Sequence, residues 1–510
     1  MIARIHTGAL LGVEALAVEV EAEVTLGMPQ FQLVGMGDRA IGESRHRVRS
    51  AVKHCGFAFP PKRVTVNLAP AYLPKDGAAF DLPIAVALLT ASEVLTREAA
   101  QGYLLAGELA LDGRLRPVPG ALPLAAKARD LGLKGILLPT ESAREASVIE
   151  GLEVLGCADL VEVVLHLSGE RLLPRTRPPE RRELRPVHEL DLSDVRGQPD
   201  AREALEVAAA GGHNLLLVGP PGTGKTMLAR RLPSILPDLE LEESLEATRV
   251  WSVAGRLRGT PLLTRPPFCA PHHSVSDAGL IGSTRPPRPG DVSLAHRGVL
   301  FLDELPEFRR NVLESLREPL EDGEVSIRRA NLAVTYPARF QLVATMNPCP
   351  CGRLTGERAD ACTCSAEAVR RYRGRVSGPL LDRFDMHVSV GPLGPAALQG
   401  PAGEGSVAVR ERVAEARSRA AARLAGAAGV GASLVNAAIP AGAIREQCRP
   451  APGAEAHLAA LVHGWELSAR AYDRLLRVAR TLADLADREL VSVEDVIRAT
   501  TFRVLDQGIL

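Results

Sequence analysis

The most restrictive feature of the chain is a glycine-rich segment between an apolar run and an amphipathic one. Residues 219–226 read GPPGTGKT, directly after NLLLV and directly before MLARRL. The pattern GxxxxGK[ST] between a strand and a helix is typical of a phosphate-binding loop, because backbone N–H groups and the helix N-terminus surround an anion. It predicts a parallel α/β sheet with this loop at its carboxyl edge. The alternative is a glycine-rich turn that binds nothing.

The lysine of this segment is the only lysine between Gly135 and the C-terminus, where arginine is used everywhere else. Lysine is a point charge on a flexible stem and arginine is a planar fork, so one retained lysine indicates a need for its geometry. We expect Lys225 to reach the β- and γ-phosphates of ATP and Thr226 to place its hydroxyl on Mg²⁺. The predicted nucleotide site comprises Gly219, Pro220, Pro221, Gly222, Thr223, Gly224, Lys225 and Thr226.

Two later apolar runs end in polar residues that can serve the same site. VLFL is followed by Asp303 and Glu304, and FQLVATM is followed by Asn347. We expect Asp303 in the Mg²⁺ shell, Glu304 orienting the attacking water, and Asn347 between the γ-phosphate and that water. The competing interpretations are a solvated acidic pair at a strand end and an asparagine in a turn.

The whole chain divides into four parts. Residues 1–170 alternate strand-like and helical stretches, which predicts an α/β domain. Residues 171–189 mix prolines with charges and form a predicted linker. Residues 190–395 hold the phosphate loop and its parallel sheet, and residues 396–510 carry Ala, Leu and Arg at helical spacing, which predicts a helical lid.

Composition excludes several classes of protein. The 510 residues are 46% hydrophobic and 24% charged, as in ordinary globular proteins of about three domains. The 61 Lys and Arg balance 61 Asp and Glu, which excludes a histone-like polycation but leaves local basic surfaces open. Eight cysteines are too few for a disulfide scaffold, and neither a signal peptide nor a membrane span is recognisable. We therefore expect a cytoplasmic protein without a membrane partner.

Five further blocks resemble the magnesium-chelatase-like AAA+ ATPases and, within them, the ComM competence family of DNA helicases. They are FCAPHHSVSDAGLIG, PRPGDVSLAHRGVLFLDELPEF, PARFQLVATMNPCPCG, SGPLLDRFD and LSARAYDRLLRVARTLADL. The resemblance covers nearly all of the chain and implies a homo-hexameric ring with ATP between neighbours. It also implies that Arg383 in LLDRFD is an arginine finger for the next subunit and that Arg470 in LSARAY is the sensor arginine of the lid. For an isolated arginine, a surface ion pair is the alternative.

Two segments resemble the loops that face the pore in this group, residues 268–290 and the hairpin-like residues 323–340. Arg328 and Arg329 stand where the hairpin should turn, and we expect them to contact DNA phosphates; a solvated turn is the alternative. The aromatic content of 3% argues against extensive base stacking, so the expected DNA contacts are independent of sequence.

A basic stretch nearer the N-terminus is a second candidate for binding DNA. Arg45, Arg49 and Lys53 follow at intervals of four, on one face of a predicted helix, with Arg47 to the side. The alternative is a solvated helix face.

Four of the eight cysteines form the pattern C-x-C, ten residues, C-x-C: Cys349, Cys351, Cys362 and Cys364. Four thiolates can complete one tetrahedral Zn²⁺ site and fix a loop that has little core of its own. The spacing is tighter than the usual C-x₂-C. The alternatives are free thiols in a surface loop and a redox pair.

Residues 1–170 resemble the Lon-protease-like domain found at the front of this family. PKDGAAFDLPIAV looks like its nucleophile loop, and AGELALDGRLRPVPGALPLAAKA looks like the segment with its catalytic lysine. The serine position holds Ala79 and the lysine position holds Leu122, so Ser–Lys peptidase chemistry is missing. We expect a binding or assembly domain here.

The resemblance favours an ATP-driven DNA helicase or branch-migration motor that promotes integration of incoming DNA during natural transformation and recombination. The alternative is a magnesium-chelatase-type or MoxR-like AAA+ ATPase that remodels a protein partner. A third hypothesis, an ATP-dependent protease, requires the missing serine and lysine.

Overall fold

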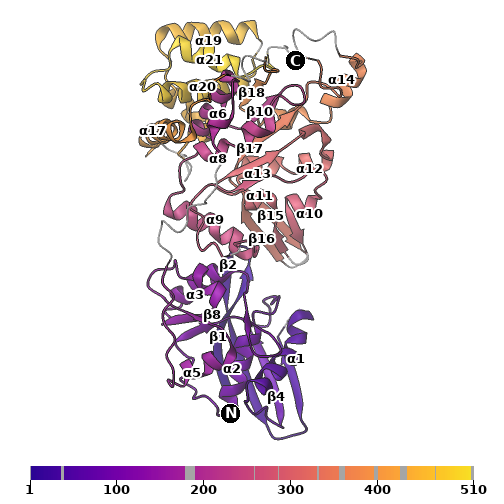
Figure 1. Cartoon of the computed structure of the whole chain (residues 1–510), viewed down its shortest axis with the longest axis vertical. Coiled ribbons are helices and arrows are strands. Elements are labelled where there is room, and N and C mark those ends of the chain that lie inside the picture. The colour runs from indigo at the N-terminus through magenta and orange to yellow at the C-terminus, as the bar shows by residue number, and fades with distance from the viewer. Residues whose placement is uncertain are drawn as a thin grey trace.

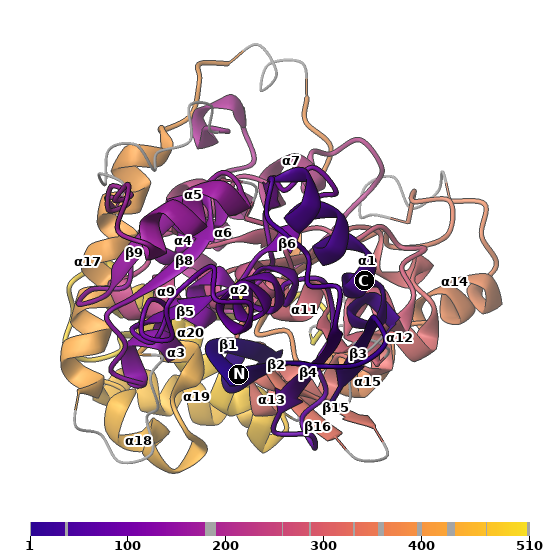
Figure 2. The same cartoon turned by 90° about the horizontal axis from the view of Figure 1, so that it is seen from below.

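The computed structural model is an elongated molecule with its N-terminal domain at one end and a helical C-terminal region at the other (Figure 1). Figure 2 shows the same molecule along its length, with the N-terminal domain towards the viewer. The structure describes residues 2–35, 39–178, 190–257, 259–284, 287–329, 332–354, 362–394, 400–425, 434–465 and 467–506, without the side chains of residues 39, 40, 329 and 332.

The N-terminal domain contains a seven-stranded mixed sheet in the order β3-β4-β2-β1-β5-β8-β9. Its strands are β1 (Ile2–Leu11), β2 (Glu14–Thr25), β3 (Gln30–Val34), β4 (Arg63–Ala69), β5 (Tyr103–Leu105), β8 (Gly135–Pro139) and β9 (Glu153–Cys157), beside the small hairpin β6 (Glu108–Leu109) and β7 (Leu115–Arg116). Its helices are α1 (Arg39–His54), α2 (Asp81–Ala91), α3 (Ala121–Asp130), α4 (Thr140–Ala146) and α5 (Leu160–Leu167). Every residue of α2 is buried, as expected for a helix that is apolar on all sides.

The core, which is the part of the chain that holds the phosphate loop, is built on a five-stranded parallel sheet in the order β11-β14-β17-β10-β18. Its strands are β10 (Leu215–Val218), β11 (Phe268–Cys269), β14 (Val299–Leu302), β17 (Gln341–Met346) and β18 (Met386–Ser389). Three of these strands, β10, β14 and β17, are buried along their whole length because helices cover both faces, which explains their continuous apolar sequences.

Helices and two hairpins surround this sheet. The helices are α6 (Pro199–Gly211), α7 (Lys225–Ala229), α8 (Leu232–Ile235), α9 (Leu241–Val253), α10 (Asp277–Leu280), α11 (Asp291–Leu294), α12 (Arg310–Glu314), α13 (Arg317–Asp322), α14 (Ala366–Arg373) and α15 (Gly378–Leu381). The antiparallel hairpins are β12 (Gly282–Thr284) with β13 (Pro287–Pro289), and β15 (Glu324–Arg329) with β16 (Leu332–Pro337). The second hairpin lies on the side of the core that faces the N-terminal domain (Figure 1).

The C-terminal region is helical and shares one hydrophobic cluster with the core. Its helices are α17 (Ser406–Leu424), α18 (Ile444–Gln447), α19 (Pro452–Gly464), α20 (Ala469–Leu485) and α21 (Val493–Thr501). The predicted α/β fold with a parallel sheet and a helical C-terminal region is thus confirmed. None of the helices in the described part of the chain is both long and apolar enough to cross a bilayer.

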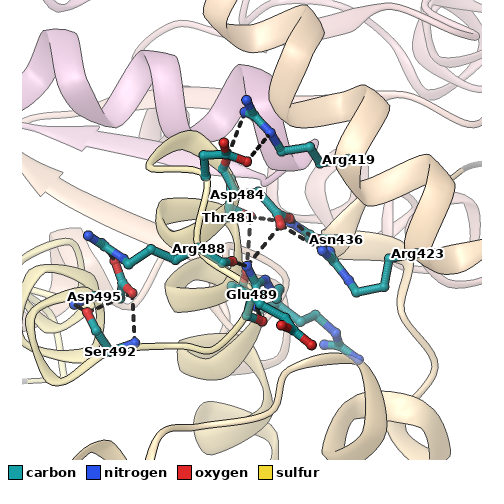
Figure 3. A network of polar contacts seen from close by, with 12 residues as sticks. Arg419, Arg423, Asn436, Thr481, Asp484, Arg488, Glu489, Ser492 and Asp495 are labelled. Atoms are coloured by element: carbon teal, nitrogen blue, oxygen red, sulfur yellow. Dashed lines mark hydrogen bonds and ion pairs between the residues drawn. The ribbon is translucent and has the colours of Figure 1, made fainter.

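Buried polar contacts fix these C-terminal helices (Figure 3). The carboxylate of Asp484 on α20 accepts hydrogen bonds from Arg423 on α17 (2.6 and 2.8 Å) and from Asn436 (2.8 Å). The amide of Asn436 also donates to the hydroxyl of Thr481 (3.0 Å). That hydroxyl lies 2.8 Å from Nε2 of His213, which stands between α6 and β10. The contacts therefore connect the lid to the strand that leads into the phosphate loop.

The predicted linker begins along the N-terminal sheet. The guanidinium of Arg175 donates to the carbonyl of Leu152 (2.9 Å), and the N–H of Thr176 donates to the carbonyl of Val154 (2.8 Å). Residues 179–189 of the predicted linker lie outside the described residues.

Candidate functional site

The phosphate loop connects the carboxyl end of β10 to α7, and two of its glycines are explained by the backbone geometry, one by close packing and one by its conformation. A Cβ at Gly219 would lie 2.1 Å from the carbonyl oxygen of Val390, so no side chain fits there. Gly224 precedes α7 with φ +88°, a conformation that glycine adopts without a steric penalty. The first turn of α7 therefore presents its free N–H groups beside the loop.

Lys225 is folded onto this loop. Its Nζ donates to the carbonyl oxygens of Gly219 and Pro220, both at 2.7 Å, and to Oδ1 of Asn347 at 3.2 Å. Burial lowers the pKa of Lys225 to about 8, and the negative charges of Asp303 and Glu304 oppose this shift. The structure thus brings the ammonium and the asparagine amide together at the place predicted for the γ-phosphate.

Thr226 and Asp303 lie side by side at the same edge of the sheet. The Thr226 hydroxyl donates to Oδ2 of Asp303 at 2.9 Å. Carboxylate and hydroxyl oxygens are ligands that suit Mg²⁺ beside phosphates, so the two residues fit the predicted metal position.

Thr345 is a residue of this site that sequence reasoning missed. Its hydroxyl donates to Oδ1 of Asp303 (2.6 Å) and accepts a hydrogen bond from the backbone N–H of Glu304 (3.0 Å). It is buried on β17, the strand between β14 and β10. A threonine within FQLVATMN indicates only a strand, because nothing in the sequence says which strand lies beside β14.

Glu304 is the second residue after β14 and adopts φ +54° and ψ +54°. This left-handed conformation is uncommon for a residue with a side chain and is concentrated at functional sites. The side chain is exposed, whereas the backbone N–H is held by Thr345. The Glu304 carboxylate therefore lies close enough to the phosphate loop to act on the charge of Lys225, and the hydrogen bond to Thr345 fixes the backbone that carries it.

Arg383 lies at the opposite edge of the sheet. Its carbonyl oxygen accepts a hydrogen bond from the side chain of Asn214 (2.9 Å), the residue before β10, whereas Lys225 follows β10. The four residues of β10, at about 3.3 Å each, separate the two edges by roughly 10–13 Å. Arg383 forms an ion pair with Glu321 of α13, and its side chain is 14% exposed whereas that of Glu321 is 55% exposed.

Arg470 lies near Arg383 rather than at the phosphate loop. It is exposed in the first turn of α20. Burial lowers the pKa of Arg383, and the positive charges of Arg470 and Arg474 lower it further. The two predicted catalytic arginines therefore share one edge of the core, and the predicted loop, acid pair and asparagine share the other.

The four cysteines come together although residues 355–361, which belong to the segment between the two pairs, lie outside the described part of the structure. The Sγ atom of Cys349 lies 3.4 Å from that of Cys351 and 3.6 Å from that of Cys362. All four sulfur atoms, with Cys364, lie within 4.8 Å of one another. A disulfide needs about 2.05 Å, whereas a tetrahedral zinc site with Zn–S bonds of about 2.3 Å places its sulfurs about 3.8 Å apart.

The thiols of the cluster differ in protonation, because the pKa of Cys351 is lowered whereas the pKa of Cys362 and that of Cys364 are raised. The backbone N–H of Arg353 lowers the pKa of Cys351 to about 6, so this thiol is ionised at neutral pH. Thiolates, not thiols, bind zinc. The arrangement fits a four-thiolate metal centre.

The predicted DNA contacts lie apart from the ATP site. Arg328 is exposed near the end of β15, opposite Ala333 of β16. Arg329 has its backbone in β15, and its side chain lies outside the described part of the structure. The hairpin predicted for this segment is therefore present, with Arg328 close to its turn.

The second basic face is present on α1. Arg45, Arg49 and Lys53 are exposed, and the guanidinium of Arg49 lies 5.5 Å from the ring centre of Phe59. Arg47, in contrast, donates to the buried carboxylate of Asp81 at 2.6 and 3.0 Å, so it belongs to the core of the domain.

The positions of the missing peptidase residues are filled by apolar packing. Leu122 is fully buried in a cluster against which Ala79 and Leu245 pack. Leu245 belongs to α9 of the core. This face of the N-terminal domain therefore contacts the core.

The parallel five-stranded sheet carries three features at its carboxyl edge: a phosphate loop, an Asp-Glu pair after a strand, and a polar residue on the strand between them. Together these features define an ATPase of the AAA+ class. The comparisons agree. The family model described as magnesium chelatase, subunit ChlI, matches residues 191–398; subunit ChlI of Mg-chelatase matches residues 20–142; and the ChlI C-terminal model matches residues 403–503.

Relatives that match the chain over nearly its full length identify the family within the magnesium-chelatase-like group. The chain is 45% identical to an uncharacterised protein of Mycobacterium tuberculosis over 98% of both chains. It is 42% identical to the uncharacterised protein YifB of Escherichia coli over 99% of this chain and 97% of that protein. It is 40% identical to the competence protein ComM of Haemophilus influenzae over 99% of this chain and 98% of that protein. The chain belongs to the ComM family of magnesium-chelatase-like AAA+ ATPases, which implies ATP hydrolysis with Mg²⁺.

Proposed function

We propose that the chain is the subunit of a hexameric ATP-dependent motor that acts as a DNA helicase and moves branch points during integration of incoming DNA. The hexameric ring is inferred from the separation of Lys225 from Arg383 and Arg470 within one subunit. Roughly 10–13 Å of β10 lie between the two edges, so these groups start from opposite edges of the sheet and one subunit is not expected to bring both to one γ-phosphate. Two neighbours in a head-to-tail ring can, because each offers a different edge.

Each residue then has a role in phosphoryl transfer. Lys225 binds the β- and γ-phosphates, and Glu304 and Asn347 orient the attacking water. Thr226 and Asp303 would hold Mg²⁺, which neutralises phosphate charge when bound. Thr345 fixes the carboxylate of Asp303 and the backbone of Glu304. Arg383 and Arg470 of the next subunit stabilise the charge that develops on the transferred group.

DNA is the proposed partner for two reasons. The exposed Arg328 on the β15–β16 hairpin presents a cation at the tip of an extended element, which suits phosphate contacts without base recognition. The relative from Haemophilus influenzae is a competence protein, and it matches this chain over nearly its whole length.

We further propose that the four cysteines hold a structural Zn²⁺ and that the protein works in the reducing cytoplasm. The sulfur separations of 3.4–3.6 Å support the metal rather than disulfides. The N-terminal domain is proposed to position and assemble the core, because the site corresponding to a peptidase dyad is packed with leucine and alanine.

The experiment is ATP hydrolysis with and without single-stranded and branched DNA, together with displacement of a labelled strand, by wild type and Lys225→Ala. Stimulation by DNA and ATP-dependent displacement by wild type alone support the motor. ATP hydrolysis that no DNA changes would favour the alternative, an ATPase that remodels a protein partner. Matches to magnesium-chelatase subunit models make that the second candidate.

A further inference from the structure

The four-cysteine loop is in direct contact with the phosphate loop. Its first cysteine stands two residues after Asn347, whose amide oxygen accepts a hydrogen bond from Lys225. The CPCG turn is closed by a hydrogen bond from the N–H of Gly352 to the carbonyl of Cys349 (2.9 Å). The cysteine loop therefore continues directly from one side of the ATP site.

Gly352 forms the contact on the other side of that site. Its φ is +75°, and a Cβ there would lie 2.3 Å from Cδ and 2.8 Å from Cγ of Pro221. The backbone at Gly352 thus packs on the proline ring of the phosphate loop with no room for a methyl group. A shift of the CPCG turn towards the phosphate loop would therefore displace Pro221.

The far end of the loop is tied back to its start. Cys364 precedes Ser365, whose hydroxyl caps α14 by accepting from the N–H of Ala368 (3.2 Å). At the other end of α14, the guanidinium of Arg373 donates to the carbonyl of Pro348 (3.0 Å), next to Cys349. Helix α14 thus follows the second cysteine pair along the chain and contacts the segment next to the first pair, so both ends of the cysteine loop are held together.

This loop has little apolar packing of its own. Among its described residues in 349–364, only Cys349 is part of the buried hydrophobic core. A segment without a core needs cross-links to hold one conformation, and four metal–thiolate bonds supply them.

We infer that the metal-bound four-cysteine cluster is a positioning element of the ATP site, which holds Pro221 through Gly352 and Asn347 through the chain. This inference rests on the proposed zinc and ATP sites. The cluster does not touch the reaction; it sets the conformation of the loop that binds phosphate. Loss of the metal, or a side chain at Gly352, therefore weakens nucleotide binding.

The test uses the full-length protein, purified without a His-tag, with zinc per subunit measured by mass spectrometry and the Kd of a fluorescent non-hydrolysed ATP analogue by titration. Cys362→Ser removes a ligand, and Gly352→Ala disturbs the contact but leaves all four thiols. Cys55→Ser, a free cysteine of the N-terminal domain, is the matched control. Far-UV circular dichroism checks that each variant folds.

We expect wild type and Cys55→Ser to contain close to one zinc and to bind the analogue equally. Cys362→Ser loses zinc and binds at least tenfold more weakly, and Gly352→Ala keeps zinc but also binds at least tenfold more weakly. Removing the metal from wild type with a chelator gives the weak Kd, and adding Zn²⁺ alone restores it.

Two results overturn the inference. If Cys362→Ser contains no zinc but has an unchanged Kd for the ATP analogue, the cluster does not position the phosphate loop. If wild type is purified without metal, no metal-bound cluster exists to position it. Neither result touches the proposed motor, which is decided separately by DNA stimulation and strand displacement. Failure of the motor likewise leaves the zinc content and the Kd values as they are.

Discussion

The hydroxyl of Ser252 on α9 donates a hydrogen bond to Oε1 of Glu145 on α4, across the junction between the ATPase core and the N-terminal domain. The same oxygen accepts from the backbone N–H of Leu122 (2.9 Å), and the N–H of Gly120 donates to the carbonyl of Ser252 (3.0 Å). The start of α3 is therefore joined to the end of α9 through one carboxyl group. Its environment makes the junction sensitive to pH.

Burial raises the pKa of Glu145 above its ordinary 4.5, against the opposing effect of the hydrogen bonds from Ser252 and Leu122. The folded junction thus binds more protons than the separated one in the window between 4.5 and the raised pKa. Its stability is highest below that window and falls as pH rises through it. Glu145→Gln keeps the acceptor oxygen for both donors without the charge. We expect this variant to lose the pH dependence and to be more stable than wild type at pH 7.

The measurement is thermal unfolding from pH 4 to pH 8, with limited proteolysis of the junction at each pH. Glu141→Gln, an exposed glutamate on the same helix, is the control and should follow wild type. A Glu145→Gln variant with the same pH slope as wild type would show that this carboxyl does not control the junction.

Nucleotide binding is predicted to weaken at alkaline pH. The pKa of Lys225 is lowered to about 8, and only the charged form attracts phosphate, so a proton is taken up on binding above that pH. We expect the Kd of a non-hydrolysed ATP analogue to rise by about tenfold per pH unit above pH 8, until the pKa of the complex is reached. Lys225→Arg stays charged at every accessible pH and should bind weakly but without this slope. Equal slopes for both proteins would contradict the prediction.

Some parts of the site follow from sequence because neighbours along the chain are neighbours in space. The loop from Gly219 to Thr226 is of this kind, and the strand ends at Asp303 and Asn347 meet it because parallel strands share a carboxyl edge. Their catalytic roles stay predictions. The role of Thr345 could not be predicted from the sequence, because it depends on the order of strands in the sheet.

Contacts between residues that are far apart in the sequence also decide which charged side chains are exposed and which are held inside the structure. Arg47 looked like a side member of a basic helix face, but its partner Asp81 lies 34 residues away and inside the domain. Glu145 and Ser252, 107 residues apart, belong to different domains. No local pattern marks such pairs, since periodicity reports burial but not the partner.

Thr345→Val is predicted to slow hydrolysis without weakening nucleotide binding much. Valine has the same shape but neither donates to Asp303 nor accepts from the N–H of Glu304, so both acidic groups lose their fixed orientation. We expect kcat to fall about tenfold or more and the free energy of unfolding to fall by about 1–3 kcal/mol, because a buried N–H is left unpaired. Thr90→Val is the matched control, since the buried Thr90 hydroxyl has no hydrogen-bond partner among the described residues. Comparable loss of kcat in both variants would contradict this role.

Mixed rings test the division of the ATP site between subunits. Lys225→Ala and Arg383→Ala should each be inactive alone, because every interface lacks one of the two cations. When the two variants are mixed and reassembled, an Arg383→Ala subunit supplies Lys225 and its Lys225→Ala neighbour supplies Arg383. About one quarter of the head-to-tail interfaces in a random 1:1 ring are then complete, so ATP hydrolysis should reappear. Mixtures that stay as inactive as their components would exclude a shared site.

The β15–β16 hairpin is predicted to hold DNA through phosphate contacts alone. Replacing Arg328 and Arg329 by glutamate should weaken DNA binding about equally for all sequences while basal ATP hydrolysis stays at its wild-type rate, since the hairpin is a separate sheet on the side of the core that faces the N-terminal domain (Figure 1). The milder Arg328→Ala should reduce the slope of log K against log salt for single-stranded DNA by about 0.7, the value for one lost phosphate contact. Arg371→Ala, an equally charged exposed residue on α14, is the control and should leave the slope unchanged. If the glutamate variant binds DNA as wild type does, the hairpin is a solvated turn, and the exposed face of Arg45, Arg49 and Lys53 on α1 becomes the next surface to reverse.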